Sequence, residues 1–287
     1  MGRAARSGRR REAGHLSDIL AAQPTDASLL AEIYDLEHDQ IDEDLVFYRE
    51  MARRHPGTVV DLGCGSGRLF AALLGGGAHR IVGIDGSRSL LERAKVRIAG
   101  HPGLTSRRSE GRIELVVGDV RRVDRRDRFA LAILAGVVAH LEGPEEALRA
   151  LVSARRLLNA DGALVLDTLG PGGLPPHDLP LSLDWERSDG NRRIVRRSRL
   201  ERREAPEGLH VSYATLTDVV EADGTIARLP ASFRLWYPSP AVLVALAVEA
   251  ELAVESIYGS HDLEPLDDDS ERCIVVARPT KREPVKG

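Results

Sequence analysis

The stretch VVDLGCGSGRLF, residues 59 to 70, decides the fold of this chain. An apolar run that contains Asp61 ends in glycines at positions 63, 65 and 67, and a helical pattern follows. Glycines between a strand and a helix let a ligand approach the backbone, and the helix amino terminus supplies free N–H groups. A dinucleotide-binding fingerprint needs glycine at its sixth position, where this chain has Arg68. The spacing G-x-G-x-G therefore indicates another nucleotide-like ligand.

Strand and helix signals alternate on both sides of this stretch. Helical periodicity also precedes it, over ASLLAEIYDLEHD and DEDLVFYREMARR. Short, nearly all-apolar strands that alternate with helices are typical of a parallel sheet covered on both faces. We predict a doubly wound α/β domain whose ligands bind at the carboxyl ends of the strands. Its first five strands are expected at residues 58–63, 79–86, 112–120, 128–136 and 163–170.

Residues 171–237 interrupt this rhythm. A Pro/Gly linker leads into three or four alternating segments, and Asp189-Gly190 and Asp223-Gly224 between them are hairpin dipeptides. We predict an antiparallel sheet inserted after the fifth strand, next to the carboxyl ends where ligands are expected. A helix and two final strands follow and are expected to add an antiparallel pair at the sheet edge. The chain then divides into a disordered basic tail (1–25), an α/β domain (26–170 and 238–280) and the β insertion (171–237).

Composition excludes several classes of protein. The chain has 287 residues, of which 43% are hydrophobic and 29% charged, as in a globular domain. A net charge of -4 argues against an overall design for nucleic acid. The longest apolar run, 129–139, is too short to span a bilayer, and we see no signal peptide. Only Cys64 and Cys273 occur, so we expect no disulfide framework, no metal site and a cytoplasmic location.

Acidic residues close the second and third predicted strands. Asp85 is placed to accept hydrogen bonds from both hydroxyls of a ribose. Asp119, after Gly118, can accept from an exocyclic amine. An aspartate after a strand is by itself more often a helix cap than a ligand contact. The glycine turn, Asp85 and Asp119 follow one another in order, each at the end of a successive predicted strand. Packing alone hardly explains this combination.

Together, VVDLGCGSG, IVGIDGS and VVGDV resemble the three S-adenosylmethionine-binding motifs of class I methyltransferases. The resemblance covers residues 30–170 well and 230–278 more loosely. It implies a seven-stranded Rossmann-like sheet with an antiparallel last strand, and S-adenosylmethionine as cofactor. The glycine loop would cradle the methionine half, Asp85 the ribose and Asp119 the adenine amine. The residues that the resemblance assigns to the cofactor are Tyr34, Asp61, Gly63, Cys64, Gly65, Gly67, Asp85, Gly86, Asp119, Val120 and Ala135.

Two further patterns narrow the resemblance. Tyr34, Asp35, Asp44, Phe47 and Tyr48 form the order YD…D…FY, and the late runs FRLWYPS and IYGSHDLEPLDDDSERCIVVA also look familiar. Both are similar to small-molecule methyltransferases of bacterial metabolism, including glycine/sarcosine-type and amino-sugar N-methyltransferases. In those enzymes an N-terminal helix covers the cofactor and a β insertion walls the acceptor pocket, which implies the same role for residues 171–237. The implied activity is methylation of an N or O atom of a small metabolite, in secondary metabolism.

A sulfonium is an activated methyl donor, so its transfer depends mainly on positioning and on exclusion of water. An ammonium or alcohol acceptor must also lose a proton, and a histidine suits that role near pH 7. His140, just after the fourth strand, is our candidate; it either acts as the base or orients the acceptor, and a mere loop residue is the alternative. Tyr34 is a second catalytic candidate that would orient the methyl donor. The residues expected to bind the acceptor are His140, Arg234, Trp236, Tyr237 and His261.

Two other functions remain open. The insertion carries RRIVRRSRLERR, and arginines on alternating strands could bind the phosphates of RNA. From Asp184 to Glu204, however, the segment contains eight arginines and five acidic residues, so its net charge is only +3. No aromatic stacking set accompanies them, so we do not expect a nucleic-acid partner. A non-catalytic S-adenosylmethionine-binding protein is the other alternative, and a homodimer through the exposed insertion is possible.

Overall fold

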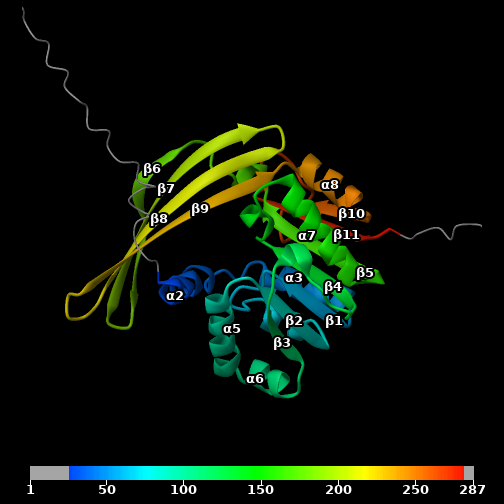
Figure 1. Ribbon diagram of the computed structural model, residues 1–287, viewed down its shortest axis with the longest axis horizontal. Helices are drawn as coiled ribbons and strands as arrows, with labels where there is room; N and C mark the ends of the chain where they lie inside the picture. Colours follow the sequence, from blue (N-terminus) through cyan, green and yellow to red (C-terminus); the bar gives the residue numbers. More distant parts are fainter. Residues whose placement is uncertain (1–25, 281–287) are drawn as a thin grey trace, which may run out of the picture.

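The computed structural model describes residues 26–280, so the predicted basic tail lies outside the described residues. The chain begins with two helices and then alternates strand and helix (Figure 1). The elements of this α/β part are α2 (Ala27–His38), α3 (Leu45–Arg54), β1 (Thr58–Leu62), α4 (Phe70–Gly75), β2 (Arg80–Asp85), α5 (Arg88–Gly100), α6 (Pro102–Ser109), β3 (Ile113–Val117), η1 (Val120–Arg122), β4 (Phe129–Ala135), η2 (Val138–His140), α7 (Pro144–Leu157), β5 (Leu158–Leu169), η3 (Pro171–Gly173), α8 (Pro240–Glu249), β10 (Leu252–Tyr258) and β11 (Arg272–Pro279).

Seven strands form one sheet in the order β10-β11-β5-β4-β1-β2-β3. The neighbours from β5 to β3 run parallel, and β11 runs antiparallel to both β5 and β10. The predicted seven-stranded, mostly parallel sheet is therefore confirmed, but the antiparallel strand lies inside the sheet, one position from its edge. The chain order reverses between β1 and β4, and ligands of open α/β sheets bind at the carboxyl ends of the strands beside such a reversal.

Both faces of this sheet are buried, as the apolar strands require. In β1, Val60 belongs to the core on the face that α7 and α8 cover, whereas its neighbour Val59 belongs to the core that includes residues of α3 to α6. The helices begin at residues with suitable side chains. Asp26 accepts hydrogen bonds from two backbone N–H groups of α2, and Ser87 accepts one from α5. The polar helix α6, which starts at a proline, was not expected from the sequence.

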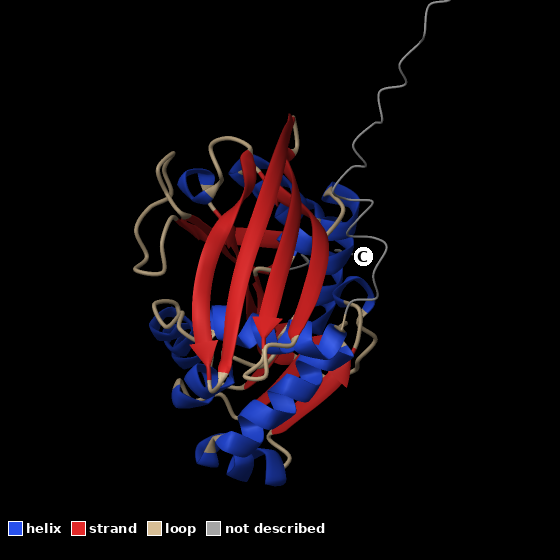
Figure 2. Cartoon of the chain, turned by 90° about the vertical axis from the view of Figure 1, so that its left-hand side faces the viewer, coloured by secondary structure: helices blue, strands red, loops and turns tan. Residues whose placement is uncertain are grey.

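The insertion is a separate antiparallel sheet of four long strands: β6 (Leu179–Asp189), β7 (Arg192–Ala205), β8 (Gly208–Val220) and β9 (Ile226–Pro238). Figure 2 shows this sheet face on, as a layer of its own. Gly190 and Gly224 have φ angles of 58° and 85°, as tight turns demand at these positions. Helix α2 is attached to this sheet, because Ile33 packs against Ile194 and Val219. Among the described residues, no helix has the length and apolar character needed to cross a membrane.

Candidate functional site

The glycine turn after β1 is built so that no side chain can occupy it. Gly63, Gly65 and Gly67 all have positive φ, at 78°, 54° and 75°. A Cβ on Gly63 would lie 2.3 Å from Cγ2 of Val137, and one on Gly65 would lie 3.3 Å from the hydroxyl of Tyr34. The N–H groups of Gly63 and Cys64 both donate to the carbonyl of Ile84, at 2.7 and 3.1 Å, which fixes the turn against β2.

Asp85 connects this turn to the next helix. Its Oδ2 accepts from the Gly65 N–H at 2.8 Å, and its Oδ1 accepts from the Ser87 N–H at 2.7 Å. Each carboxylate oxygen has two lone pairs, so both oxygens can still accept from the hydroxyls of a ribose. Asp85, the residue predicted to bind the ribose, therefore also holds the glycine turn and the start of α5 in place.

Asp61 is a buried carboxyl group, only 2% exposed, and among the described residues its Oδ2 has no hydrogen-bond partner. Burial and the nearby charge of Asp85 raise its pKa to about 7, against the opposing effect of Arg68. An unpartnered acid beside a bare glycine turn fits a cationic ligand. The ammonium and sulfonium groups of S-adenosylmethionine meet that requirement, so the residues present fit this cofactor. The Cys64 side chain is buried in the core, and only its backbone is at the turn.

Asp119 is less free than the sequence suggested. Its Oδ1 accepts from the backbone N–H and the Nε of Arg121, at 3.0 and 2.8 Å, and its Oδ2 accepts from Nη2 at 2.9 Å. Hydrogen bonds from Arg121 hold its pKa below the usual range. Asp119 thus caps η1, and its contact with adenine stays a prediction. Gly86 lies beside open space, since a Cβ there would meet nothing closer than the Gly118 carbonyl at 3.8 Å. Val120 is partly buried and packs against the margin of the core.

Helix α2 spans the distance between the turn and the inserted sheet. The Tyr34 hydroxyl faces Gly65, and its ring stacks on His38 at a centroid distance of 4.0 Å. The buried Asp35 accepts from Arg93 and Arg97 of α5, at 2.7 and 3.2 Å. The helix is therefore fixed to the α/β domain on one side, with Tyr34 over the glycine turn.

His140 lies at the end of η2, beside the inserted sheet. Its ring makes an edge contact with Phe233 of β9 at 6.4 Å, and Phe233 stacks on Tyr213 of β8 at 6.2 Å. The side chain keeps access to solvent, and partial burial of the ring lowers the pKa of His140, so the ring is neutral near pH 7. The three rings form a continuous surface, which we call the aromatic wall (His140, Tyr213 and Phe233).

The pairing register decides which other candidates share the face of this wall. Side chains alternate along a strand, so Tyr237 lies on the face of Phe233, whereas Arg234 and Trp236 lie on the opposite face. Trp236 is 1% exposed and belongs to the main core. The structure therefore does not bring Arg234 and Trp236 together with the aromatic wall. The sequence predicted the strand, but a strand pattern does not say which of its two faces turns inward.

A charged cluster at the end of β5 was not predicted as a unit. The carboxylate of Asp167, 2% exposed, accepts from the Tyr48 hydroxyl at 2.6 Å and the Arg272 Nε at 2.9 Å, and lies 2.9 Å from Nε2 of His261. Burial alone would raise the pKa of Asp167, but His261, Arg272 and Tyr48 outweigh it and lower the pKa. Asp167 is paired in register with Ala135 at the end of β4. The signal that could have revealed it is the one used for Asp85, an aspartate near a strand end.

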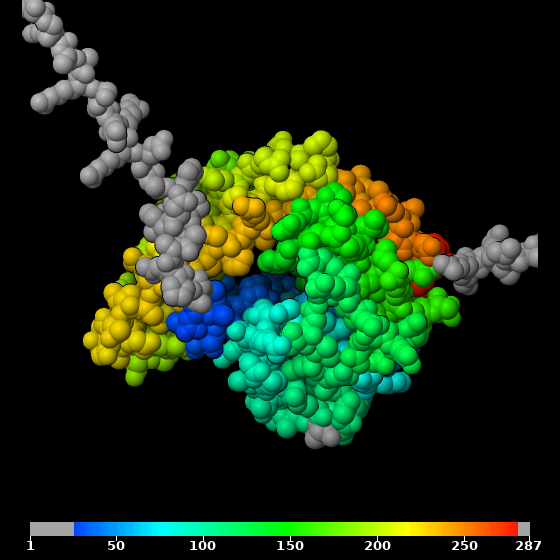
Figure 3. All heavy atoms as spheres, in the orientation of Figure 1, coloured from blue at the N-terminus to red at the C-terminus, as the bar shows by residue number. Residues whose placement is uncertain are grey.

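Figure 3 shows a hollow at the centre of one face, between the blue N-terminal helices, the cyan and green segments of the α/β domain and the yellow-orange inserted sheet. The described residues contain no group of three or more His, Cys, Asp or Glu side chains suited to a metal ion.

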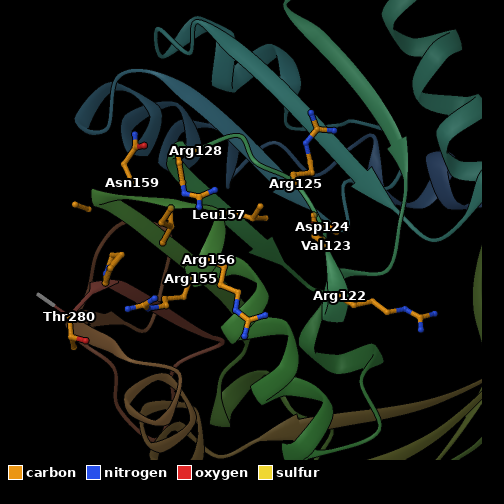
Figure 4. Close-up of a pocket in the computed structure, with 13 residues that line it drawn as sticks. Arg122, Val123, Asp124, Arg125, Arg128, Arg155, Arg156, Leu157, Asn159 and Thr280 are labelled. Carbon is orange, nitrogen blue, oxygen red and sulfur yellow. The ribbon is translucent and has the colours of Figure 1, made fainter. Parts of the chain in front are cut away.

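A cavity of about 690 Å³ lies at the amino-terminal ends of β4 and β5. It is lined by several arginines, but Figure 4 shows Arg122 and Arg125 pointing away from the others. Arg125 is already held by Glu114, and Arg155 by Glu251. The glycine turn follows the carboxyl end of β1, which runs parallel to β4, so this cavity lies at the opposite end of the sheet from the turn. We therefore place the candidate site at the glycine turn and not at this cavity.

Part of the chain is similar to a known protein family. Residues 59–162 match the family model described as a methyltransferase domain. A curated relative, the tRNA U34 carboxymethyltransferase of Shewanella loihica, is 36% identical over 116 residues, which are 39% of this chain and 31% of that protein. The chain thus spans about a third of the length of the curated relatives it matches.

Solved structures match over nearly the whole chain. The CcbJ methyltransferase of Streptomyces caelestis has a TM-score of 0.65 and 21% identity, over 93% of this chain and 96% of that one. DesVI of Streptomyces venezuelae has a TM-score of 0.66 and 18% identity, over 90% and 100%. An amino pentose methyltransferase of Micromonospora echinaspora, solved with S-adenosylmethionine, has a TM-score of 0.58 and 18% identity, over 96% and 100%. These likenesses show a shared fold.

Residues 59–162, which include the glycine turn, thus match a methyltransferase domain. The chain shares its fold with solved S-adenosylmethionine-dependent methyltransferases.

Proposed function

We propose that this chain transfers the methyl group of S-adenosylmethionine to a nitrogen or oxygen atom of a small metabolite in secondary metabolism. The observation that carries the proposal is the aromatic wall, which joins η2 of the methyltransferase domain to the inserted sheet. A rigid aromatic face suits the apolar side of a ring or the cationic form of an amine. The solved structures of similar fold include amino-sugar methyltransferases, which supports a small acceptor.

In this proposal the chain acts chiefly by positioning. The cofactor supplies an activated methyl group on its sulfonium. Asp85 holds the ribose, Tyr34 covers the glycine turn, and α2 with the inserted sheet (171–237) closes the site against water. His140 and Phe233 orient the acceptor for in-line attack, because a well-aligned pair of reactants gains most of its rate from orientation.

The test is a screen for methyl transfer. Purified protein is incubated with methyl-labelled S-adenosylmethionine and a panel of glycine, sarcosine, amino sugars and hydroxylated metabolites. We expect acceptor-dependent formation of S-adenosylhomocysteine with at least one small molecule. Binding of the cofactor without transfer to any acceptor, tRNA included, would favour a non-catalytic binding protein.

RNA is the second candidate acceptor, because the curated relatives are named for tRNA. The structure gives a reason to place it second. The arginines that would bind phosphate are already paired with carboxylates: Arg192 with Glu32, Arg193 with Glu186, Arg196 with Glu37, and Arg197 with Asp218. Binding RNA would require breaking these pairs. Salt-dependent tRNA binding that disappears when all four arginines are replaced by glutamine would reverse the order of the two candidates.

We further propose that the enzyme works in the cytoplasm. Its two cysteines, Cys64 and Cys273, are both free and buried in the structure. Free thiols are the normal state in a reducing compartment.

A further inference from the structure

We propose that His261, oriented by Asp167, accepts the proton that the methyl acceptor loses. This proposal rests on the proposed function, methylation of a small molecule. Asp167 is a positioning residue here, and His261 is the catalytic base. His140, for comparison, contacts aromatic rings, and no carboxylate of the described residues holds it.

The contacts fix the tautomer of the His261 ring. The lowered pKa of Asp167 keeps its carboxyl group ionised near pH 7. An ionised carboxylate only accepts hydrogen bonds, so Tyr48, Arg272 and His261 must all donate to it. Nε2 of His261 therefore carries the proton in its 2.9 Å bond to Asp167. In the neutral ring Nδ1 then has a free lone pair, and no described residue hydrogen-bonds it.

The position of the pair suits proton transfer. Asp167 is the register partner of Ala135, which the resemblance to class I methyltransferases places beside the sulfonium. His261 lies in the loop between β10 and β11, close to Phe47 and Tyr48 of α3, at ring distances of 5.5 and 6.1 Å. The ionisable groups around it are Asp167 from β5, Tyr48 from α3 and Arg272 from β11. Arg272 pairs with the other oxygen of the Asp167 carboxylate, so the two groups balance each other's charge next to the ring.

The reaction balances without a further reagent. An amine acceptor that arrives as an ammonium ion passes one proton to Nδ1 of His261, which becomes an imidazolium stabilised by Asp167. The free amine then attacks the methyl carbon, so that a C–N bond forms as the C–S bond breaks and the sulfonium becomes a thioether. The imidazolium returns its proton to water after the products leave.

The first test needs no acceptor. Protein labelled with ¹⁵N-histidine and saturated with S-adenosylhomocysteine is studied by long-range ¹H–¹⁵N spectra, with His261→Gln used to assign the signals. We expect a neutral ring with its proton on Nε2. A proton on Nδ1, or an equal mixture of tautomers, would overturn the proposal whatever the acceptor is.

The second test uses an acceptor found in the screen above. Glutamine can still donate to Asp167 but cannot take up a proton, so His261→Gln should lower kcat by about 10²–10⁴-fold and leave KM and cofactor affinity unchanged. The deficit should shrink as pH rises toward the acceptor's own pKa, since the free amine then needs no base. His101→Gln, an exposed histidine at the start of α6, is the matched control. Full kcat in His261→Gln would refute the base, whereas failure of the wild-type protein to methylate any small molecule would refute the proposed function.

Discussion

Replacement of Asp85 by alanine should damage both the glycine turn and the cofactor site. The carboxylate accepts from two backbone N–H groups, those of Gly65 and Ser87, at 2.8 and 2.7 Å. Hydrogen bonds to a charged group contribute about 1.5–3 kcal/mol each. The gain from removing its repulsion with Asp61, whose pKa it raises, offsets part of that loss. We expect the free energy of unfolding to fall by about 2–4 kcal/mol.

The binding free energy of the cofactor should weaken by a similar amount, because two hydrogen bonds from ribose hydroxyls to the Asp85 carboxylate disappear. A loss of about 2–4 kcal/mol corresponds to about a 30- to 1,000-fold weaker affinity for S-adenosylhomocysteine. Asp85→Asn keeps one acceptor oxygen, so its affinity for S-adenosylhomocysteine should lie between those of Asp85→Ala and the wild type. Titration calorimetry measures the affinity, and urea unfolding measures the stability of the same samples.

Asp124→Ala is the matched control, since Asp124 is exposed and lies away from the turn. It should stay within about 0.5 kcal/mol of the wild type in both assays. If Asp85→Ala binds S-adenosylhomocysteine with wild-type affinity, the ribose assignment is wrong. If the wild-type protein binds a nicotinamide dinucleotide tightly, the interpretation of the glycine spacing fails as a whole.

Three further changes test other parts of the structure. Gly63→Ala should lower the free energy of unfolding by about 2–4 kcal/mol, and the additional change Val137→Ala should relieve the clash but not the left-handed backbone, which costs about 1–2 kcal/mol. Arg196→Ala should cost about 1.5–3 kcal/mol in urea unfolding because it removes a mostly buried guanidinium that joins Glu37 of α2 to Tyr213 of β8, whereas Arg193→Ala, at an exposed pair, should cost less than about 1 kcal/mol. The raised pKa of Asp61, about 7, means that its stabilising effect is fully present below pH 4 and is lost as pH rises through 7. Wild-type protein should therefore lose stability between pH 4 and pH 8, by on the order of 4 kcal/mol relative to Asp61→Asn.

The α/β domain was predictable because its information is local. Apolar runs such as TVVDL and RIVGID must be buried on both faces, and the glycines between strand and helix admit few alternatives. The local patterns did not predict helix α6 or the first residues of β5. Helix α6 has little apolar periodicity, and β5 begins at Leu158, before the Asp161-Gly162 dipeptide that we expected to precede it.

The charged cluster around Asp167 was harder to predict because its contacts join residues far apart in the chain. Tyr48, Asp167, His261 and Arg272 come from four different segments, and no spacing rule connects them. A β-strand pattern also gives the alternation of faces but not the direction of each face. Arg234 was expected beside the acceptor for that reason, although it lies on the face opposite Phe233.

Helix α2 links the two halves of the site. Its Tyr34 faces the glycine turn, its Asp35 is held by α5, and its Glu37 is paired with Arg196 of the inserted sheet. The helix therefore contacts both the glycine turn and the sheet that carries Tyr213 and Phe233 of the aromatic wall. Ion pairs of this kind are weaker in water than apolar packing and can break and re-form, whereas Ile33 anchors the helix to the sheet through apolar contacts. Apolar packing on the inserted sheet and ion pairs with α5 together hold Tyr34 over the glycine turn, so the cover of this turn depends on contacts from both parts of the chain.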